Sequence, residues 1–178
     1  MPRDSRIITI ENTKFIFITN FSGDPERDTY GNKTRKANII IPTEEQADDL
    51  AHAGFNVKVC YSKEDKGRLE LPKTTSDYDV YLNIKSDLEM PVTFYVSIIA
   101  NFDSEWPPSI YTVCDGKPEK LTEKNVSRID KVYVTNVNAV LNPYYSKRND
   151  SWSLYIKTMY VEYDDTEDPF AQRYAQDE

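Results

Sequence analysis

Tyrosine and cationic side chains share several short stretches of this chain. Lys33, Arg35 and Lys36 follow Tyr30 in one polar segment, and Tyr–Lys pairs recur further along. An aromatic ring can stack on an unpaired base and a cation can neutralise a phosphate, so the combination is typical of surfaces that bind single-stranded nucleic acid. The residues that we expect to make such contacts are Phe21, Tyr30, Lys33, Arg35, Lys36, Tyr81, Lys85, Tyr95, Tyr155 and Lys157. Because tyrosine is also a good strand former, packing alone is the alternative role for its rings.

No group of residues matches a catalytic or metal centre. His52 is the only histidine, so any Ser-His-Asp or Cys-His pair must use it, yet interaction with a helix dipole already explains its place near the end of an expected helix. His52, Cys60 and Cys114 are too widely spaced for a four-ligand zinc site. We therefore expect no enzymatic activity, no metal and no cofactor. Acidic pairs such as Asp103 with Glu105 leave a Mg²⁺-dependent nuclease as an alternative.

The negative charge of the chain is concentrated at its C-terminus. The 178 residues carry 22 Lys and Arg against 30 Asp and Glu, a net charge of −8. Residues 164–178 hold six acids and one base, so the other 163 residues have a net charge of only −3. An acidic run is often a solvated tail. Because its acids flank an aromatic residue, we expect it to bind a protein partner or to compete with nucleic acid, through Asp164, Asp165, Glu167, Asp168 and Phe170.

Targeting signals are not apparent in the sequence. The first apolar stretch, residues 7–10, is too short for a secretory signal, and no window approaches the ~18 apolar residues of a membrane helix. Cys60 and Cys114 lie in apolar, strand-like runs, which favours buried free thiols over a disulfide. We expect a cytoplasmic protein without membrane contact.

The elements that would position these side chains are mostly strands. Runs of β-branched and aromatic residues bounded by turn-forming residues predict nine strands, at 7–10, 15–19, 37–41, 55–61, 79–85, 92–101, 109–114, 131–141 and 153–163. Thr43 and Gln46 form a capping box that predicts a helix from Thr43 to Ala53, ended by Gly54. A second short helix is expected at 121–128. This pattern indicates a β-rich barrel or sandwich.

Three of the expected strands place a tyrosine on their polar face. Side chains alternate between the two faces of a strand, so Tyr81, Tyr95 and Tyr155 point away from the apolar residues on either side of them. The long polar segment 21–36 adds two glycines, two aromatic residues and four cations. Long loops in compact domains are often functional, so this segment is a further candidate for binding.

Several segments, taken in order, resemble the single-stranded DNA-binding proteins of bacteriophages, which are small OB-fold proteins. The segments are 20–23, 47–58, 142–144, 156–161 and 168–174, of which Asn142-Pro143-Tyr144 and Lys157-Thr158-Met159-Tyr160-Val161 are the most specific. The resemblance covers nearly the whole chain. It departs at Ile39, where an aromatic residue is expected after the asparagine, and this argues against stacking at Ile39.

This resemblance implies a mainly β fold, an elaborated OB-fold or partly open β-barrel with one short helix and a flexible acidic tail. It implies an OB-fold nucleic-acid-binding domain over residues 1–163 and a tail over 164–178 that meets replication or recombination proteins. We expect the chain to bind and protect single-stranded DNA, largely without sequence preference, in phage replication or recombination, and to be able to form homo-oligomers. The main alternative is a phage-encoded protein-interaction module or DNA mimic that inhibits a host enzyme.

Overall fold

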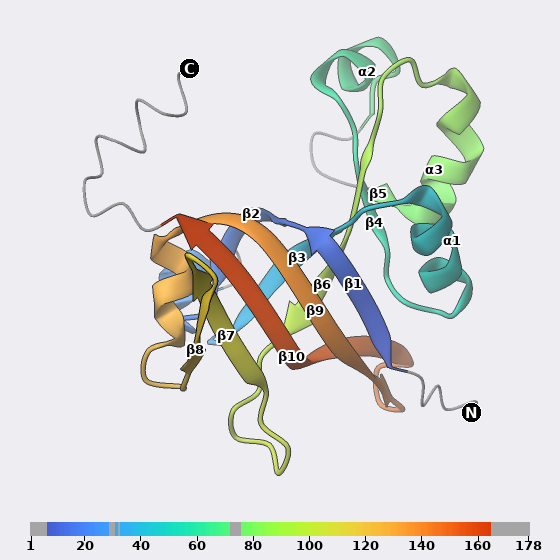
Figure 1. Cartoon of the computed structure of the whole chain (residues 1–178). Helices are drawn as coiled ribbons and strands as arrows, with labels where there is room; N and C mark the ends of the chain where they lie inside the picture. Colours follow the sequence, from blue (N-terminus) through green and yellow to red (C-terminus); the bar gives the residue numbers. More distant parts are fainter. Residues whose placement is uncertain (1–6, 29–30, 32, 72–75, 165–178) are drawn as a thin grey trace.

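The computed structural model describes residues 7–28, 31, 33–71 and 76–164, and their ten strands form one strongly curved sheet (Figure 1). The strands are β1 (Ile8–Thr13), β2 (Phe15–Asn20), β3 (Lys36–Ile41), β4 (Lys58–Cys60), β5 (Ser76–Asp77), β6 (Thr93–Ile99), β7 (Ser109–Cys114), β8 (Lys117–Leu121), β9 (Tyr133–Ser146) and β10 (Ser151–Asp164). The path through the sheet is β1-β9-β10-β6-β3-β2. The β7–β8 hairpin continues from β10, and the β4–β5 pair continues from β6.

The sheet curves into a barrel that stays partly open between β6 and β10. These two strands run parallel and pair only at Tyr155 and Ile99, whereas β10 pairs with β9 along almost its whole length. Beyond that point β10 pairs with β7 over five residues. The expected mainly β, partly open OB-like barrel is therefore confirmed.

The core follows the period-two alternation of the strands. Ile39 on β3, Val96 on β6, Leu141 on β9 and Met159 on β10 are all buried inside the barrel. Polar and aromatic side chains alternate with them on the other face. The pairing of β10 with β9 shifts register between Ile156 and Thr158, so the inward positions on β10 change from even-numbered to odd-numbered residues at this bulge.

A helical segment lies between β3 and β6 on one side of the barrel (Figure 1). It contains α1 (Glu44–His52), α2 (Lys63–Arg68) and α3 (Tyr78–Ile84), followed by the 3₁₀ turn η2 (Lys85–Asp87). The predicted helix after Thr43 is confirmed as α1, because the Thr43 hydroxyl accepts a hydrogen bond from the backbone N–H of Gln46 at 3.2 Å. The Gln46 side chain donates to the carbonyl of Thr9 instead of closing the capping box.

The prediction of a strand at 79–85 is wrong, because these residues belong to α3 and the start of η2. Alternating apolar residues suggested a strand, but the buried pair is Tyr78 and Tyr81, which are three residues apart and both contact the ring of Phe94. That spacing brings two side chains onto one face of a helix. Val80 and Leu82 are left exposed.

Smaller differences concern the ends of elements and the cysteines. The strand expected at 55–61 covers only β4, and the one expected from 131 begins at Tyr133 and runs on to Ser146. The helix expected at 121–128 is the 3₁₀ helix η3 (Val126–Lys131), and a further 3₁₀ turn, η1, spans Pro25–Arg27. Cys60 and Cys114 are free, as expected, but each is half-buried.

Candidate nucleic-acid interface

A groove crosses the outer faces of β3, β6 and β10 at the open side of the barrel. It consists of three adjoining hollows of about 480, 290 and 370 Å³. The first and second hollows share Asn38, and the second and third share Ile99. Cross-strand pairs form its floor, with Asn38 opposite Ser97, Lys36 opposite Ile99, and Ile99 opposite Tyr155.

One end of the groove carries an exposed phenylalanine in a strained conformation. The ring of Phe17 meets Tyr95 edge-on, with centroids 5.2 Å apart and planes at 82°. The Phe17 side chain is 56% exposed, and its backbone has φ of +63°, a left-handed conformation that is rare for a bulky residue. Such strain concentrates at functional sites. Phe17 could not be predicted from the sequence, since nothing in the alternation of β2 signals the register shift that turns it outward.

Tyr95 contributes less to the surface than expected. It lies on the outer face of β6, as the alternation predicted, and lines the middle hollow. Its side chain is only 7% exposed, because Phe17 and neighbouring strands cover it. The predicted outward face of Tyr95 is confirmed, and Phe17 presents the more accessible ring.

Two further aromatic residues line the groove beside β6. Tyr155 lies on β10 at the junction with Ile99 and borders the third hollow, as expected for a binding residue. Trp152 borders the middle hollow and packs against Phe55, with ring centroids 5.5 Å apart. Gly54 makes room for this indole, since a Cβ at Gly54 would lie 3.1 Å from Trp152 Cδ1. Its φ of +99° also fits the left-handed helix stop that the sequence predicted.

Cations follow the groove from end to end, and most of them are paired with carboxylates. Lys36 Nζ lies 2.9 Å from Asp28 Oδ1 in the first hollow, and Lys58 Nζ lies 2.6 Å from Asp77 Oδ1 beside the middle one. Lys58 was not predicted, because it stood in a run that was read as a core strand. These ion pairs hold the ammonium groups in place, but the carboxylates also reduce the attraction of the ammonium groups for phosphate.

Lys33 and Arg35, which the sequence predicts to contact nucleic acid, both line the third hollow. Lys33 is exposed. The Arg35 guanidinium donates to the carbonyl of Phe21 at 2.6 Å, lies 3.7 Å from Glu123 and sits over the ring of Phe102. Arg35 therefore stabilises the fold through these contacts and also lines the groove.

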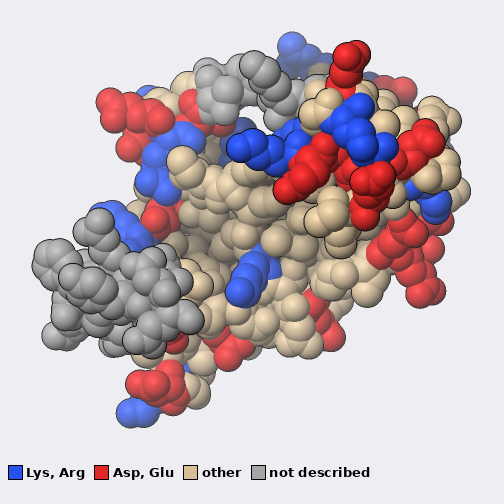
Figure 2. Space-filling model, turned by 90° about the horizontal axis from the view of Figure 1, so that it is seen from above, with Lys and Arg blue, Asp and Glu red and all other residues tan. Residues whose placement is uncertain are grey.

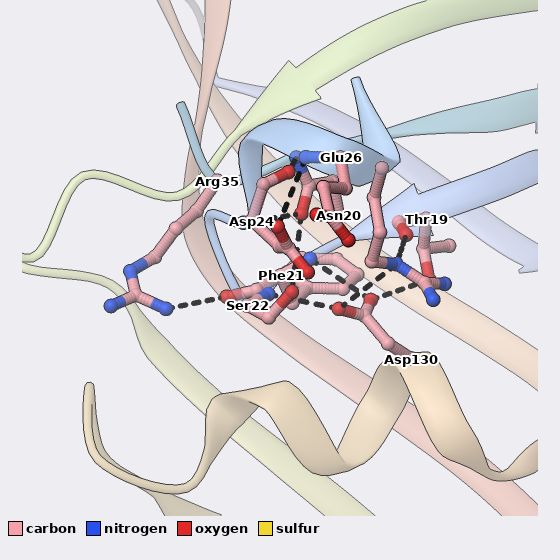
Figure 3. Close-up of polar contacts among 9 residues, drawn as sticks. Thr19, Asn20, Phe21, Ser22, Asp24, Glu26, Arg35 and Asp130 are labelled. Atoms are coloured by element: carbon pink, nitrogen blue, oxygen red, sulfur yellow. Dashed lines mark hydrogen bonds and ion pairs between the residues drawn. The ribbon is translucent and has the colours of Figure 1, made fainter. Parts of the chain in front are cut away.

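The loop that carries these cations is held by the carboxylate of Asp130, which points from η3 toward residues 19–22 (Figure 3). Asp130 accepts hydrogen bonds from the Thr19 hydroxyl at 2.6 Å and from the backbone N–H groups of Phe21 and Ser22, both at 2.9 Å. The Arg27 guanidinium lies 3.7 Å away. The Asp130 side chain is only 2% exposed, so these bonds are formed in a buried, low-dielectric site.

Asn20 organises the turn that follows. Its Oδ1 accepts from the backbone N–H of Asp24 at 3.0 Å, and its Nδ2 donates to the Asp24 carbonyl at 3.0 Å. The segment 20–23, which the sequence analysis linked to binding, is thus a structural turn. Phe21 is fully buried and packs against Phe15, so the prediction that Phe21 contacts nucleic acid is wrong.

Tyr81 and Lys85 lie in the helical segment and line none of the three hollows. Tyr81 is buried and donates its hydroxyl to Glu44, and burial together with this carboxylate raises its pKa. Tyr78 beside it donates to Asp48, and burial first and this bond second raise its pKa to about 12. Lys85 Nζ lies 3.8 Å from Glu44. The structure therefore buries the Tyr81 ring, which was expected to stack on a base, and places Lys85 on η2 away from the groove.

The remaining predicted residues divide into two groups. Lys157 is exposed at the bulge of β10 and lines none of the three hollows. Asp164 is exposed at the end of β10. Tyr30, Asp165, Glu167, Asp168 and Phe170 lie outside the described residues.

Acidic and basic side chains are distributed unevenly over the surface. Figure 2, seen from above, shows a broad, mostly uncharged area with Lys and Arg side chains around and within it, while many Asp and Glu side chains gather on the right. That side is where Figure 1 places α1 and α3.

Within the described ranges, no three His, Cys, Asp or Glu side chains are grouped so that they could hold a metal ion. His52 is exposed beside Asp48, whose carbonyl and carboxylate raise its pKa.

Among the helices of residues 7–28, 31, 33–71 and 76–164, none is long and apolar enough to cross a membrane. No family model and no curated protein matches the sequence.

Solved structures of phage proteins match the fold over nearly its full length. A C-terminally truncated single-stranded DNA-binding protein from bacteriophage Enc34 matches with 11% identity and a TM-score of 0.42, covering 90% of this chain and 87% of that chain. The untruncated Enc34 protein matches with 11% identity and a TM-score of 0.41, covering 94% and 89%. Gp2.5, a single-stranded DNA-binding protein encoded by bacteriophage T7, matches with 13% identity and a TM-score of 0.36, covering 98% and 95%. The expected resemblance to phage single-stranded DNA-binding proteins is therefore found again as a likeness of fold.

Proposed function

We propose that this chain binds and protects single-stranded DNA in the groove, largely without sequence preference, in phage DNA replication or recombination. The observation that carries the proposal is the row of rings and cations along three joined hollows. Phe17, Trp152 and Tyr155 provide the rings, and Lys33, Arg35, Lys36 and Lys58 provide the cations. A positive groove lined with aromatic side chains is the arrangement by which single strands are bound.

The chemistry of these groups explains why sequence would matter little. Every base has a face on which an aromatic ring can stack, and every nucleotide brings one phosphate. Stacking on a ring contributes about 1–3 kcal/mol per base. A groove that contacts only the faces of bases and the phosphates therefore accepts any sequence. Duplex DNA would bind more weakly, because its bases are already stacked on one another.

The ion pairs imply moderate affinity. Asp28, Asp77 and Glu123 already neutralise Lys36, Lys58 and Arg35 in part, so phosphates would have to compete with these carboxylates. Four phosphate contacts on a single strand predict a slope of about −3 for the logarithm of the binding constant against the logarithm of salt concentration. Binding would be tight at low salt and would weaken steeply as salt rises.

Binding of a labelled thymidine oligonucleotide, followed by fluorescence anisotropy across a salt series, tests the proposal. Lys58→Gln should weaken binding and reduce the salt slope by about 0.7, the loss of one phosphate contact. Lys120→Gln, the same charge change on exposed β8 outside the groove, is the matched control and should leave both unchanged. Absence of binding at 50 mM salt by the full-length chain and by a chain without residues 165–178 would refute the proposal.

We further propose that residues 164–178 form the acidic tail of this module and meet a replication or recombination protein. The net charge of −5 in this segment also suits it to compete with DNA for the groove cations. Both roles use the same carboxylates, so a bound partner would release the groove for DNA.

The DNA-mimic alternative is less well supported. A mimic presents a face of exposed, unpaired acids, whereas three acids of the helical segment are engaged within the chain. Glu44 contacts Tyr81 and Lys85, while Asp48 contacts Tyr78 and Asp65 contacts Arg68.

A further inference from the structure

A fourth hollow lies next to the groove, beyond Tyr155. It has a volume of about 560 Å³ and is lined by Asn101, Ser104, Trp106, Asn142, Pro143, Tyr144, Tyr155 and Ile156. None of these residues is charged. Tyr155 and Asn101 line both this hollow and the third hollow of the groove, so the two are continuous.

The rings around this hollow form a corner. Tyr144 and Tyr155 meet at 90° with centroids 5.9 Å apart. Trp106 is 84% exposed, which leaves most of a large apolar ring in water. Exposed aromatic side chains that are grouped, unlike single scattered ones, mark interaction sites. A flat, uncharged group bound in this corner could stack on one of the two tyrosine rings while its edge contacts the other ring.

The loop that carries Trp106 is restrained. The Ser104 hydroxyl accepts from the backbone N–H of Trp106 at 2.9 Å, and Asn101 Oδ1 accepts from the N–H of Asp103 at 3.1 Å. Pro107 and Pro108 follow directly and limit the backbone further. The indole is therefore presented on a short, closed turn, which lowers the entropy lost when a ligand binds.

Two amides in the hollow have hydrogen-bonding groups to offer. The Asn142 side chain makes no hydrogen bond to another described residue, and Asn101 keeps its NH₂ group after Oδ1 is used. A carboxamide can donate and accept at once, which matches the polar edge of a nucleobase. The nearest cations, Lys33 and Arg35, lie in the adjoining hollow, where a phosphate would be bound.

We infer that this fourth hollow takes up one nucleobase turned out of the bound strand, stacked among Trp106, Tyr144 and Tyr155 and read at its edge by Asn101 and Asn142. The inference rests on the proposed function and adds a preference for particular bases at one position to an otherwise indifferent groove. A phosphate or other anion does not fit this hollow, because no positive side chain lines it.

The test uses an oligonucleotide trimmed to the shortest length that keeps full affinity, so that it cannot slide, with one abasic site placed at each position in turn. For the full-length chain, abasic sites over the groove rings should weaken binding, and one further position, seated in the fourth hollow, should also weaken it about 5- to 150-fold, as expected for loss of one stacked base. The Trp106→Ala/Tyr144→Ala double variant should lose that position-dependent penalty. Tyr160→Ala removes an exposed ring of β10 that lies outside the groove and the fourth hollow, and this variant should keep the position-dependent penalty. The four bases at that position should differ in affinity, and Asn142→Ala should bring them closer together.

Two results would overturn the inference while leaving the proposed function intact. One is tight binding by the full-length chain with equal affinity for the four bases at every position. The other is an equal position-dependent penalty in the full-length chain and in the double variant. Failure of the full-length chain to bind any oligonucleotide would instead refute the proposed function, and the inference would fall with it.

Discussion

The ring of Phe17 meets the ring of Tyr95 at 82°, with their centroids 5.2 Å apart, at one end of the groove. Phe17 occupies a left-handed backbone conformation and exposes more than half of its side chain, while Tyr95 beneath it is almost fully buried. Packing on Tyr95 does not explain why Phe17 is both strained and largely exposed. It is well placed to stack on a base that enters the groove.

Replacing Phe17 should separate binding from stability. We expect Phe17→Ala to weaken oligonucleotide binding about 5- to 150-fold, because one stack of about 1–3 kcal/mol is lost. Phe17→Gly should weaken binding as much but be about 1 kcal/mol more stable than Phe17→Ala, since glycine accepts φ of +63° without strain. Anisotropy and urea unfolding measure the two effects, and Tyr133→Ala, at an exposed ring outside the groove, is the control. Unchanged affinity in both Phe17 variants would show that this ring does not contact DNA.

Asp130 should be required to hold the loop at 19–28. Asp130→Ala leaves the N–H groups of Phe21 and Ser22 and the Thr19 hydroxyl without their acceptor, and we expect it to lower the free energy of unfolding by about 2–4 kcal/mol. Asp130→Asn should be destabilising too, because its NH₂ group would face N–H donors. Urea unfolding gives the free energies, and limited proteolysis reports the loop. A loss below about 0.5 kcal/mol in Asp130→Ala would contradict this account of the network.

Acid should destabilise the helical segment through Asp65. The Arg68 guanidinium, 2.9 Å away, and the backbone N–H groups of Met90 and Glu89 hold the pKa of this carboxyl below its ordinary value. Its folded-state pKa is lower than its unfolded-state pKa, so it stabilises the fold above an unfolded value of about 3.9. That contribution is lost as the pH falls from there through the folded-state value.

Unfolding midpoints measured between pH 6 and pH 2 test this. Asp65→Asn should be less stable at pH 6 and should show a shallower loss of stability on acidification. Asp115→Asn, at an exposed turn, should follow the unmodified chain. The same acid dependence in Asp65→Asn as in the unmodified chain would mean that other carboxyls control it.

Removing the tail should tighten DNA binding. Deleting residues 165–178 removes five acids and one base, so we expect a higher affinity at low salt and a difference that shrinks as salt screens the charges. A chain of unchanged length, with those acids replaced by Asn and Gln, separates charge from bulk and should behave like the deletion. Equal affinity with and without the tail would argue that it does not compete for the groove.

The strands and their faces could be predicted from the sequence wherever alternation was regular. Tyr95 and Tyr155 do point outward, because the apolar residues beside them are drawn into the core. The pattern failed at 79–85, where a run of alternating apolar residues is compatible with a strand and only the burial of Tyr78 and Tyr81 against Phe94 selects a helix.

The groove itself could not be predicted, because it depends on contacts between distant segments. The bulges at Phe17 and Lys157 arise from register with partner strands, which the local sequence does not encode. Lys58 and Phe17 were consequently not predicted, and Phe21, which was expected to contact nucleic acid, is buried. The cations at 33–36 were identified because a polar segment rich in charge must lie at the surface.

Photochemical crosslinking tests the central claim most directly. A bromodeoxyuridine oligonucleotide bound to the full-length chain, irradiated and analysed by mass spectrometry of the digest, identifies the residues in contact with bases. The groove account predicts adducts at Phe17, Trp152 and Tyr155, all reduced by excess unlabelled single strand and by high salt. Adducts concentrated instead at Tyr111 and Tyr160, the stacked pair on β7 and β10 outside the groove, would contradict it.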